Sequence, residues 1–121
     1  MKKRILKTTV EVYASEKELS LVDQKLLKKA KQALKKSYSP YSNFKVGAAI
    51  LLNNGKMMSG SNQENASYPS GLCAERTAIY YAGAQFPNAK IVKVVVEELY
   101  NWEKVTKLYN EVKSAYPNDW W

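Results

Sequence analysis

The chain has 121 residues, a formal net charge of +8, one cysteine and no histidine. A hydrophobic fraction of 45% in a chain of this length suits one folded domain and excludes global disorder. No apolar run approaches the length of a membrane span, and a single cysteine excludes an intrachain disulfide, so we expect a cytoplasmic protein without a membrane anchor. The absence of histidine excludes histidine catalysis and histidine-bound metal.

The positive charge has two interpretations. A net positive charge is typical of proteins that bind nucleic acid or anionic surfaces. Here the lysines gather in "KKR" near the start and in "KLLKKAKQALKK", which follows the pattern of a solvated helix face. We therefore favour a solvated surface over specific nucleic-acid binding.

The first half of the chain predicts an arm, a helix and a hairpin. Residues 1–19 form an N-terminal arm, and Ser20 caps a helix that runs to about Ser37 with leucines and alanines at the helical period. "SPYSN" ends this helix through a proline and turn formers. The segments "FKVGAAILL" and "KMMSGS" read as two strands joined by a hairpin at "NNG".

The second half predicts a loop, a helix, a strand and a last helix. The polar stretch "NQENASYPS" reads as a loop, and residues 73–85 as a helix. The almost continuously apolar segment 90–96 predicts a central strand, and from Glu97 an amphipathic helix is expected. That helix carries an apolar stripe of Trp102, Val105, Tyr109, Val112 and Tyr116. The order helix, strand, strand, helix, strand, helix indicates an α/β sandwich with a small mixed sheet.

Cys73 and Arg76 lie at the predicted start of a helix. A helix N-terminus lowers the pKa of a thiol, and a nearby arginine favours the thiolate further, so Cys73 is a candidate metal ligand. A lone cysteine is more often a small buried hydrophobe, which remains the alternative. A nucleophilic cysteine would need a base, usually histidine, and the chain has none.

Glu75 follows Cys73 by two residues. It is a candidate proton shuttle beside a metal-bound water, because such a group exchanges protons without binding the metal itself. The structural alternative is an acidic residue that complements the helix N-terminus.

Asn62, Glu64 and Phe44 are candidates for substrate binding. Asn62 and Glu64 flank Gln63 on an extended segment, so both side chains face one way and could grip the vicinal hydroxyls of a sugar. The alternative for Asn62 is a turn that satisfies its own backbone. Phe44 is either a core residue or a stacking surface for a base.

Three stretches, "SPYSNFKVGAAILL", "GSNQENASYPSGLCAER" and the helix that follows, resemble the cytidine deaminase family of small zinc-dependent nucleoside deaminases. The resemblance runs from about Leu26 to Val94. Its specific parts are the Asn-x-Glu-Asn loop, the Cys-Ala-Glu-Arg run and the spacing between them. It implies a cytidine deaminase-like three-layer sandwich, here truncated, in a single domain with a divergent helix and tail from residue 97.

The resemblance also implies roles for the candidate residues. Cys73 would be a zinc ligand, Glu75 the proton shuttle and Arg76 a supporting cation that offsets thiolate charge. Backbone groups around Ala74 would help to hold the base. Asn62 and Glu64 would hold the ribose hydroxyls and Phe44 would face the pyrimidine. The resemblance implies Zn²⁺ as the cofactor, and a small nucleoside and further copies of the chain as partners. It also implies a role in pyrimidine salvage. An oligomer would also use the apolar surface that the aromatic stripe and the Trp120–Trp121 pair offer.

The sequence departs from the family after Val96. The family continues into a Pro-Cys-x-x-Cys run that supplies two more zinc ligands, whereas "VVVEELYNWEKVTKLYNEVKSAYPNDWW" has neither cysteine nor histidine. Three routes would complete the zinc site. Asp or Glu side chains would act as ligands, a neighbouring protomer would donate its Cys73, or a separate polypeptide would supply the missing ligands. The divergent end is compatible with natural divergence, a frameshift or deletion, or an engineered replacement.

We therefore expect a cytidine deaminase-family protein that is inactive or impaired as a single chain. The reaction implied is the hydrolytic deamination of cytidine or deoxycytidine to uridine or deoxyuridine. The alternative is a non-catalytic nucleoside-binding or structural oligomer.

Overall fold

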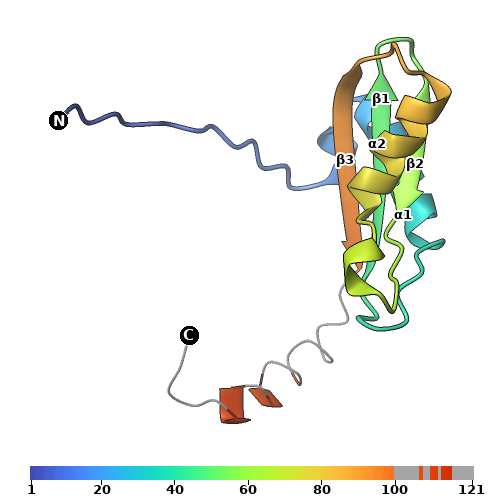
Figure 1. The fold of residues 1–121 in the computed structure, drawn as a ribbon. Helices are drawn as coiled ribbons and strands as arrows, with labels where there is room; N and C mark the ends of the chain where they lie inside the picture. Colours follow the sequence, from blue (N-terminus) through green and yellow to red (C-terminus); the bar gives the residue numbers. More distant parts are fainter. Residues whose placement is uncertain (100–106, 108–109, 112, 116–121) are drawn as a thin grey trace.

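The computed structural model describes residues 1–99, 107, 110–111 and 113–115 of the chain. Figure 1 shows its elements, which confirm the predicted α/β fold. In chain order they are η1 (Glu16–Glu18), α1 (Leu21–Leu34), β1 (Lys45–Leu52), β2 (Met57–Ser61), η2 (Tyr68–Ser70), α2 (Ala74–Gln85) and β3 (Ile91–Leu99).

The three described strands form one sheet in the order β2-β1-β3. Both pairings are antiparallel, where a mixed sheet was expected. The hairpin at Gly55, whose φ of +83° suits glycine, places β2 on one side of β1. The connection through α2 then places β3 on the other side, so β2 and β3 run in the same direction without being neighbours.

The prediction that residues 90–96 form a central strand was wrong. In the described part of the chain β3 pairs with β1 alone and lies at the edge of the sheet. The strand also continues to Leu99, because Gly47 and Lys45 of β1 pair with Glu97 and Leu99. The change of pattern at Glu97 therefore marks charged residues on an edge strand and not the start of a helix.

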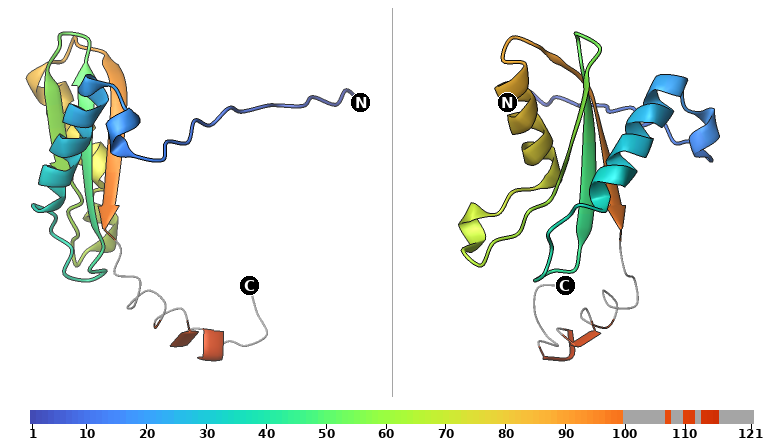
Figure 2. Two further views of the ribbon diagram at one scale, coloured as in Figure 1. Left: turned by 180° about the vertical axis from the view of Figure 1, so that it is seen from behind. Right: turned by 90° about the vertical axis from the view of Figure 1, so that its right-hand side faces the viewer.

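Helices α1 and α2 cover opposite faces of the sheet, which gives three layers (Figure 2). One core lies between α2 and the sheet, where Ala48, Ile50 and Met58 meet Ala74 and Ala78. The second core lies on the other face, where Ala49 meets Leu26 and Ala30 of α1. Successive residues of β1 thus alternate between the two cores, as the pleat of a strand requires.

Two glycines allow the helices to approach the sheet closely. A Cβ atom at Gly47 would lie 2.1 Å from the carbonyl oxygen of Ala30 in α1. A Cβ atom at Gly60 would lie 2.5 Å from the backbone nitrogen of Ala78 in α2. Both contacts are with backbone, which side-chain movement cannot relieve, so these positions fix how each helix sits on its face.

The ends of the helices agree largely with the predictions. Ser20 caps α1, since its hydroxyl oxygen accepts a hydrogen bond from the Asp23 amide at 3.2 Å. The helix ends at Leu34, slightly before the predicted Ser37. Near the C-terminus the described residues from Lys107 to Ala115 are helical, while the aromatic stripe and the Trp120–Trp121 pair lie outside the described residues.

Residues 1–13 contain neither helix nor strand and extend away from the sandwich (Figure 1). They are exposed throughout. Among the described residues, no helix is long and apolar enough to cross a membrane.

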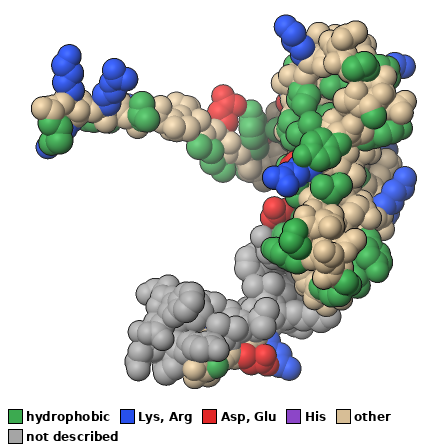
Figure 3. Space-filling model, viewed as in Figure 1, with side chains coloured by type: hydrophobic (Ala, Val, Ile, Leu, Met, Phe, Trp, Pro, Cys, Tyr) green, Lys and Arg blue, Asp and Glu red, His purple; other side chains and the backbone are tan. Residues whose placement is uncertain are grey.

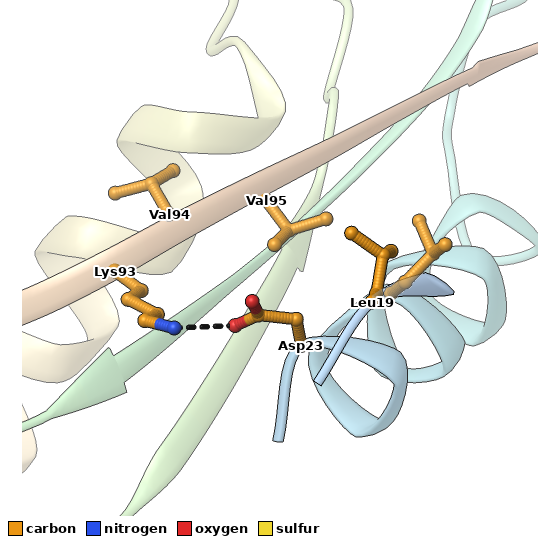
Figure 4. Close-up of a pocket in the computed structure, with 6 residues that line it drawn as sticks. Leu19, Asp23, Lys93, Val94 and Val95 are labelled. Atoms are coloured by element: carbon orange, nitrogen blue, oxygen red, sulfur yellow. Dashed lines mark hydrogen bonds and ion pairs between the residues drawn. The ribbon is translucent and has the colours of Figure 1, made fainter. Parts of the chain in front are cut away.

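An ion pair links α1 to β3 at the edge of the sandwich. Figure 4 shows Lys93 of β3 directed toward Asp23 of α1, with 2.6 Å between Nζ and Oδ1. The hydrogen bond from Lys93 lowers the pKa of the Asp23 carboxyl below its usual value. Leu19, Leu27 and Val95 line a shallow cleft beside this pair.

The contact at Gly47 predicts that Gly47→Ala destabilises the fold. The methyl group would force α1 away from the sheet, and overpacking of this kind costs about 1–3 kcal/mol or more. Gly83→Ala is the matched control, because Gly83 lies in α2 with open space around its Cβ position. That variant should gain about 0.5–1 kcal/mol from helix propensity. Urea denaturation measures both free energies of unfolding, and equal stability of the Gly47 variant and the wild type would contradict the packing described.

Candidate functional site

A cleft opens at the end of the sheet where β1 begins and β2 ends, beside the N-terminus of α2. Its volume is about 730 Å³. Five of the predicted site residues line it: Phe44, Asn62, Glu64, Cys73 and Arg76. The structure therefore brings together residues from three separate stretches of the sequence.

The Glu64 carboxylate is held by the turn that precedes β1. The backbone amide of Tyr41 donates to Oε2 at 2.8 Å, and the amide of Ser42 donates to both oxygens at 3.3 and 3.2 Å. The Ser42 hydroxyl donates to Oε1 as well. Glu64 is thus fixed in the cleft wall by donors that lie more than twenty residues earlier in the chain.

These contacts set the charge of Glu64. Its partial burial raises its pKa, but the hydrogen bonds from the Ser42 side chain and the backbone amides of Tyr41 and Ser42 lower it more. The net result is a pKa below the ordinary value of 4.5, so Glu64 is a carboxylate at neutral pH.

The Asn62 side chain joins three segments at the base of the cleft. Its Oδ1 accepts hydrogen bonds from the Val46 amide at 2.9 Å and from the Ser37 hydroxyl. Its Nδ2 donates to the Phe44 carbonyl oxygen at 2.7 Å. These contacts connect the end of β2 to the start of β1 and to the segment after α1, so Asn62 has a structural role in addition to any contact with a ligand.

Phe44 combines both interpretations of its sequence position. It is half-buried and packs against the core beneath α2. It also lines the cleft. An aromatic ring that is anchored in a core and borders a cleft is suited to stack on a planar ligand.

Cys73 is the N-cap residue of α2, as predicted for a cysteine at the start of this helix. Its thiol is exposed, and its sulfur accepts a hydrogen bond from the Arg76 amide at 3.4 Å. The expectation of a buried cysteine is therefore not met, because the side chain opens to the cleft together with Arg76.

Glu75 and Ala74 lie beside the cleft but outside its lining. Glu75 is half-buried in the first turn of α2. Ala74 is fully buried, and its methyl group belongs to the core between α2 and the sheet. Any contact of Ala74 with a ligand would thus come from its backbone.

The residues present do not fit a zinc site. A catalytic zinc ion needs three protein ligands in addition to its water. The described residues hold no cluster of three or more Cys, Asp, Glu or His side chains that could bind a metal ion. The 121 residues contain one cysteine and no histidine, so they offer no second thiolate and no imidazole as a ligand.

Comparison with known proteins identifies the family. Residues 21–109 match the family model described as the cytidine and deoxycytidylate deaminase zinc-binding region, and the chain belongs to this family. Among curated relatives, the cytidine deaminase of Halalkalibacterium halodurans is 52% identical over 59 residues, which are 49% of this chain and 45% of that protein. The cytidine deaminase of Mycobacterium tuberculosis is 49% identical over 55 residues, 45% of this chain and 41% of that protein.

Solved structures show the same fold. The cytidine deaminase of Mycobacterium leprae superposes with a TM-score of 0.61 at 39% identity over 65% of this chain and 66% of that one. The cytidine deaminase of Burkholderia pseudomallei gives a TM-score of 0.60 at 42% identity over 69% of this chain and 65% of that one. The chain spans about half the length of the curated relatives it matches.

Sequence reasoning missed the residues that support the cleft. Tyr41 and Ser42 hold Glu64, and Ser37 holds Asn62. The available signal was the run "SPYSN", whose turn formers were interpreted only as the end of a helix. Exposed amides in a turn are donors, and a carboxylate predicted in a nearby loop was a natural acceptor for them.

The lowered pKa of Glu64 predicts a pH-dependent contribution to stability. A carboxyl whose pKa is lower in the folded state stabilises the fold above its unfolded pKa, and this contribution disappears as the pH falls through the folded value. Wild type should therefore exceed Glu64→Gln in free energy of unfolding near neutral pH, and the difference should shrink as the pH falls below 4.5. Urea titrations across this range measure it. A difference that stays constant with pH would contradict the assigned hydrogen bonds.

Proposed function

We propose that the cleft binds a pyrimidine nucleoside and belongs to the hydrolytic deamination of cytidine or deoxycytidine. The observation that carries the proposal is that one cleft collects Phe44, Asn62, Glu64 and Cys73. Family membership supplies the reaction class. Pyrimidine salvage in the cytoplasm is the corresponding cellular role.

Glu64 suits a sugar-binding role because it is charged, fixed and open to the cleft. A carboxylate offers about four acceptor positions on its two oxygens. Ser42 provides one of its partners through a hydroxyl, which can rotate away when a ribose hydroxyl takes its place. A hydrogen bond to an ionised group contributes about 1.5–3 kcal/mol, which is enough to select a nucleoside over a free base.

The other cleft residues have complementary roles in the proposal. Phe44 would stack on the pyrimidine, while Asn62 would offer its second amide hydrogen to the sugar and keep β1 in place. Cys73 and Arg76 line the same cleft and would face the amino end of the base. Glu75 is the proposed proton carrier, and the backbone at Ala74 the proposed contact to the base.

We further propose that this chain alone binds the nucleoside without efficient turnover. Deamination by hydrolysis needs an activated water, which enzymes of this type obtain from a zinc ion with three protein ligands. One thiolate does not make such a site. Binding without catalysis is thus the function that the donor set favours for the isolated chain.

Calorimetric titration with cytidine, uridine and free cytosine tests the binding step. Both nucleosides should bind, and free cytosine should bind at least roughly tenfold more weakly because it lacks the hydroxyls that Glu64 accepts from. Glu64→Ala should weaken cytidine binding by roughly 10- to 100-fold. Glu18→Ala removes an equivalent charge from η1, none of whose residues lines the cleft, and should leave the affinity unchanged.

The same protein samples test whether the chain converts cytidine to uridine. Chromatography of cytidine after prolonged incubation with the chain should show no uridine above background. An absence of nucleoside binding at millimolar concentration would overturn the binding proposal, and uridine formation by the isolated chain that Glu75→Gln abolishes would overturn the proposal of impaired turnover.

A further inference from the structure

The positive charge of the chain is concentrated in its first 36 residues. They hold 11 of the 19 Lys and Arg residues but 4 of the 11 Asp and Glu residues, which gives them +7 of the formal net charge of +8. The rest of the chain is nearly neutral. A charge asymmetry of this kind between two parts of a chain indicates an anionic partner for the charged part.

Helix α1 carries a row of lysines on its outer side. Its inner side is buried, where Leu26 and Ala30 pack on the sheet. Figure 2 shows α1 on the face of the sheet opposite α2. The row consists of the exposed lysines of α1 and of the two residues that follow it, Lys25, Lys28, Lys35 and Lys36. It extends over about 16 Å, since a helix rises about 1.5 Å per residue.

No acidic side chain neutralises the lysine row. The acidic residues near α1 are bound elsewhere, because Glu16 pairs with Lys31 and Asp23 pairs with Lys93. Within the part of the chain that the structure describes, no ion pair involves a lysine of the row. Like charges at neighbouring positions of a helix repel each other, and an anionic partner would relieve this repulsion.

The N-terminal arm, residues 1–13, adds further cations ahead of α1. Its basic residues are Lys2, Lys3, Arg4 and Lys7, and all of them are exposed. Figure 3 shows the basic side chains gathered at the outer end of the arm. Basic N-terminal arms of this kind are typical of proteins that bind nucleic acid.

From these features we propose that the lysine row and the arm bind the phosphate backbone of a nucleic-acid duplex. A duplex carries one negative charge per about 1.7 Å of its axis, so it offers regularly spaced phosphates along the whole row. The contact involves phosphates alone and reads no base sequence. It therefore differs from the specific recognition that the charge pattern of the sequence did not favour.

The composition of the lysine row favours a duplex over a membrane. From Lys25 to Lys36, every exposed position holds Lys or Gln. A helix that lies on a membrane surface buries large apolar side chains among the lipids, and this stretch offers none on its outer side. The row therefore suits a partner whose charges lie at its surface.

The proposed surface is separate from the nucleoside cleft. The lining of the cleft includes no residue of the arm or of α1. Binding of a duplex and binding of a nucleoside are therefore independent, and either one can fail without the other.

Fluorescence anisotropy with two labelled DNA duplexes of unrelated sequence, each of about 20 base pairs, tests the proposal. Wild type should bind both equally, with a Kd of about 1–100 µM at physiological salt. The logarithm of the affinity should fall linearly with the logarithm of the salt concentration. Lys28→Gln with Lys35→Gln should weaken binding at least roughly tenfold and reduce the salt slope by about two, because each lysine contributes one phosphate contact.

Lys56→Gln with Lys90→Gln is the matched control. It removes the same charge from two exposed lysines outside the arm and α1, and it should bind DNA nearly like wild type. Equal weakening by the two double variants would overturn the proposal, because net charge alone would then explain the binding. Absence of duplex binding at roughly 50 mM salt would also overturn it, and so would binding to phosphatidylserine vesicles in place of DNA.

Discussion

Close packing of a helix on each face of β1 is the constraint on which the rest of the structure depends. Gly47 brings the backbone of α1 against one face, and Gly60 of β2 brings α2 against the other. Because α2 is held there, its N-terminus lies beside the end of the sheet where β1 begins, and Cys73 lines the same cleft as Asn62 and Glu64. Within the described part of the chain, the same helix packs on β1 and β2 and makes little contact with β3.

Much of this arrangement was predictable because it is encoded locally. Ser20 caps a helix, the Asn-Asn-Gly turn makes a hairpin, and Cys73 begins a helix through interactions within a few residues. The position of β3 was not predictable, since an apolar run has the same appearance in a central strand and in an edge strand. The support of Glu64 was not predictable either, because its donors lie at Tyr41 and Ser42 and only the fold brings them near.

The cleft holds the side chains that we propose to bind the sugar and the base. Glu64 is ionised and held by three donor groups, Asn62 ties the start of β1 to the end of β2, and Phe44 is anchored in the core. In contrast, the described residues hold no group of three or more Cys, His, Asp or Glu side chains that could bind a metal ion with Cys73. The family membership of the chain agrees with the proposed nucleoside site, whereas its donor set does not fit a zinc ion.

The zinc content of the purified chain tests this account most directly. Elemental mass spectrometry, with Cys73→Ala measured alongside, gives the number of zinc ions per chain. The account predicts a folded protein with far less than one zinc per chain and no difference between wild type and the variant. One zinc per chain that disappears in the Cys73 variant would contradict it, because ligands beyond those described would then complete the site.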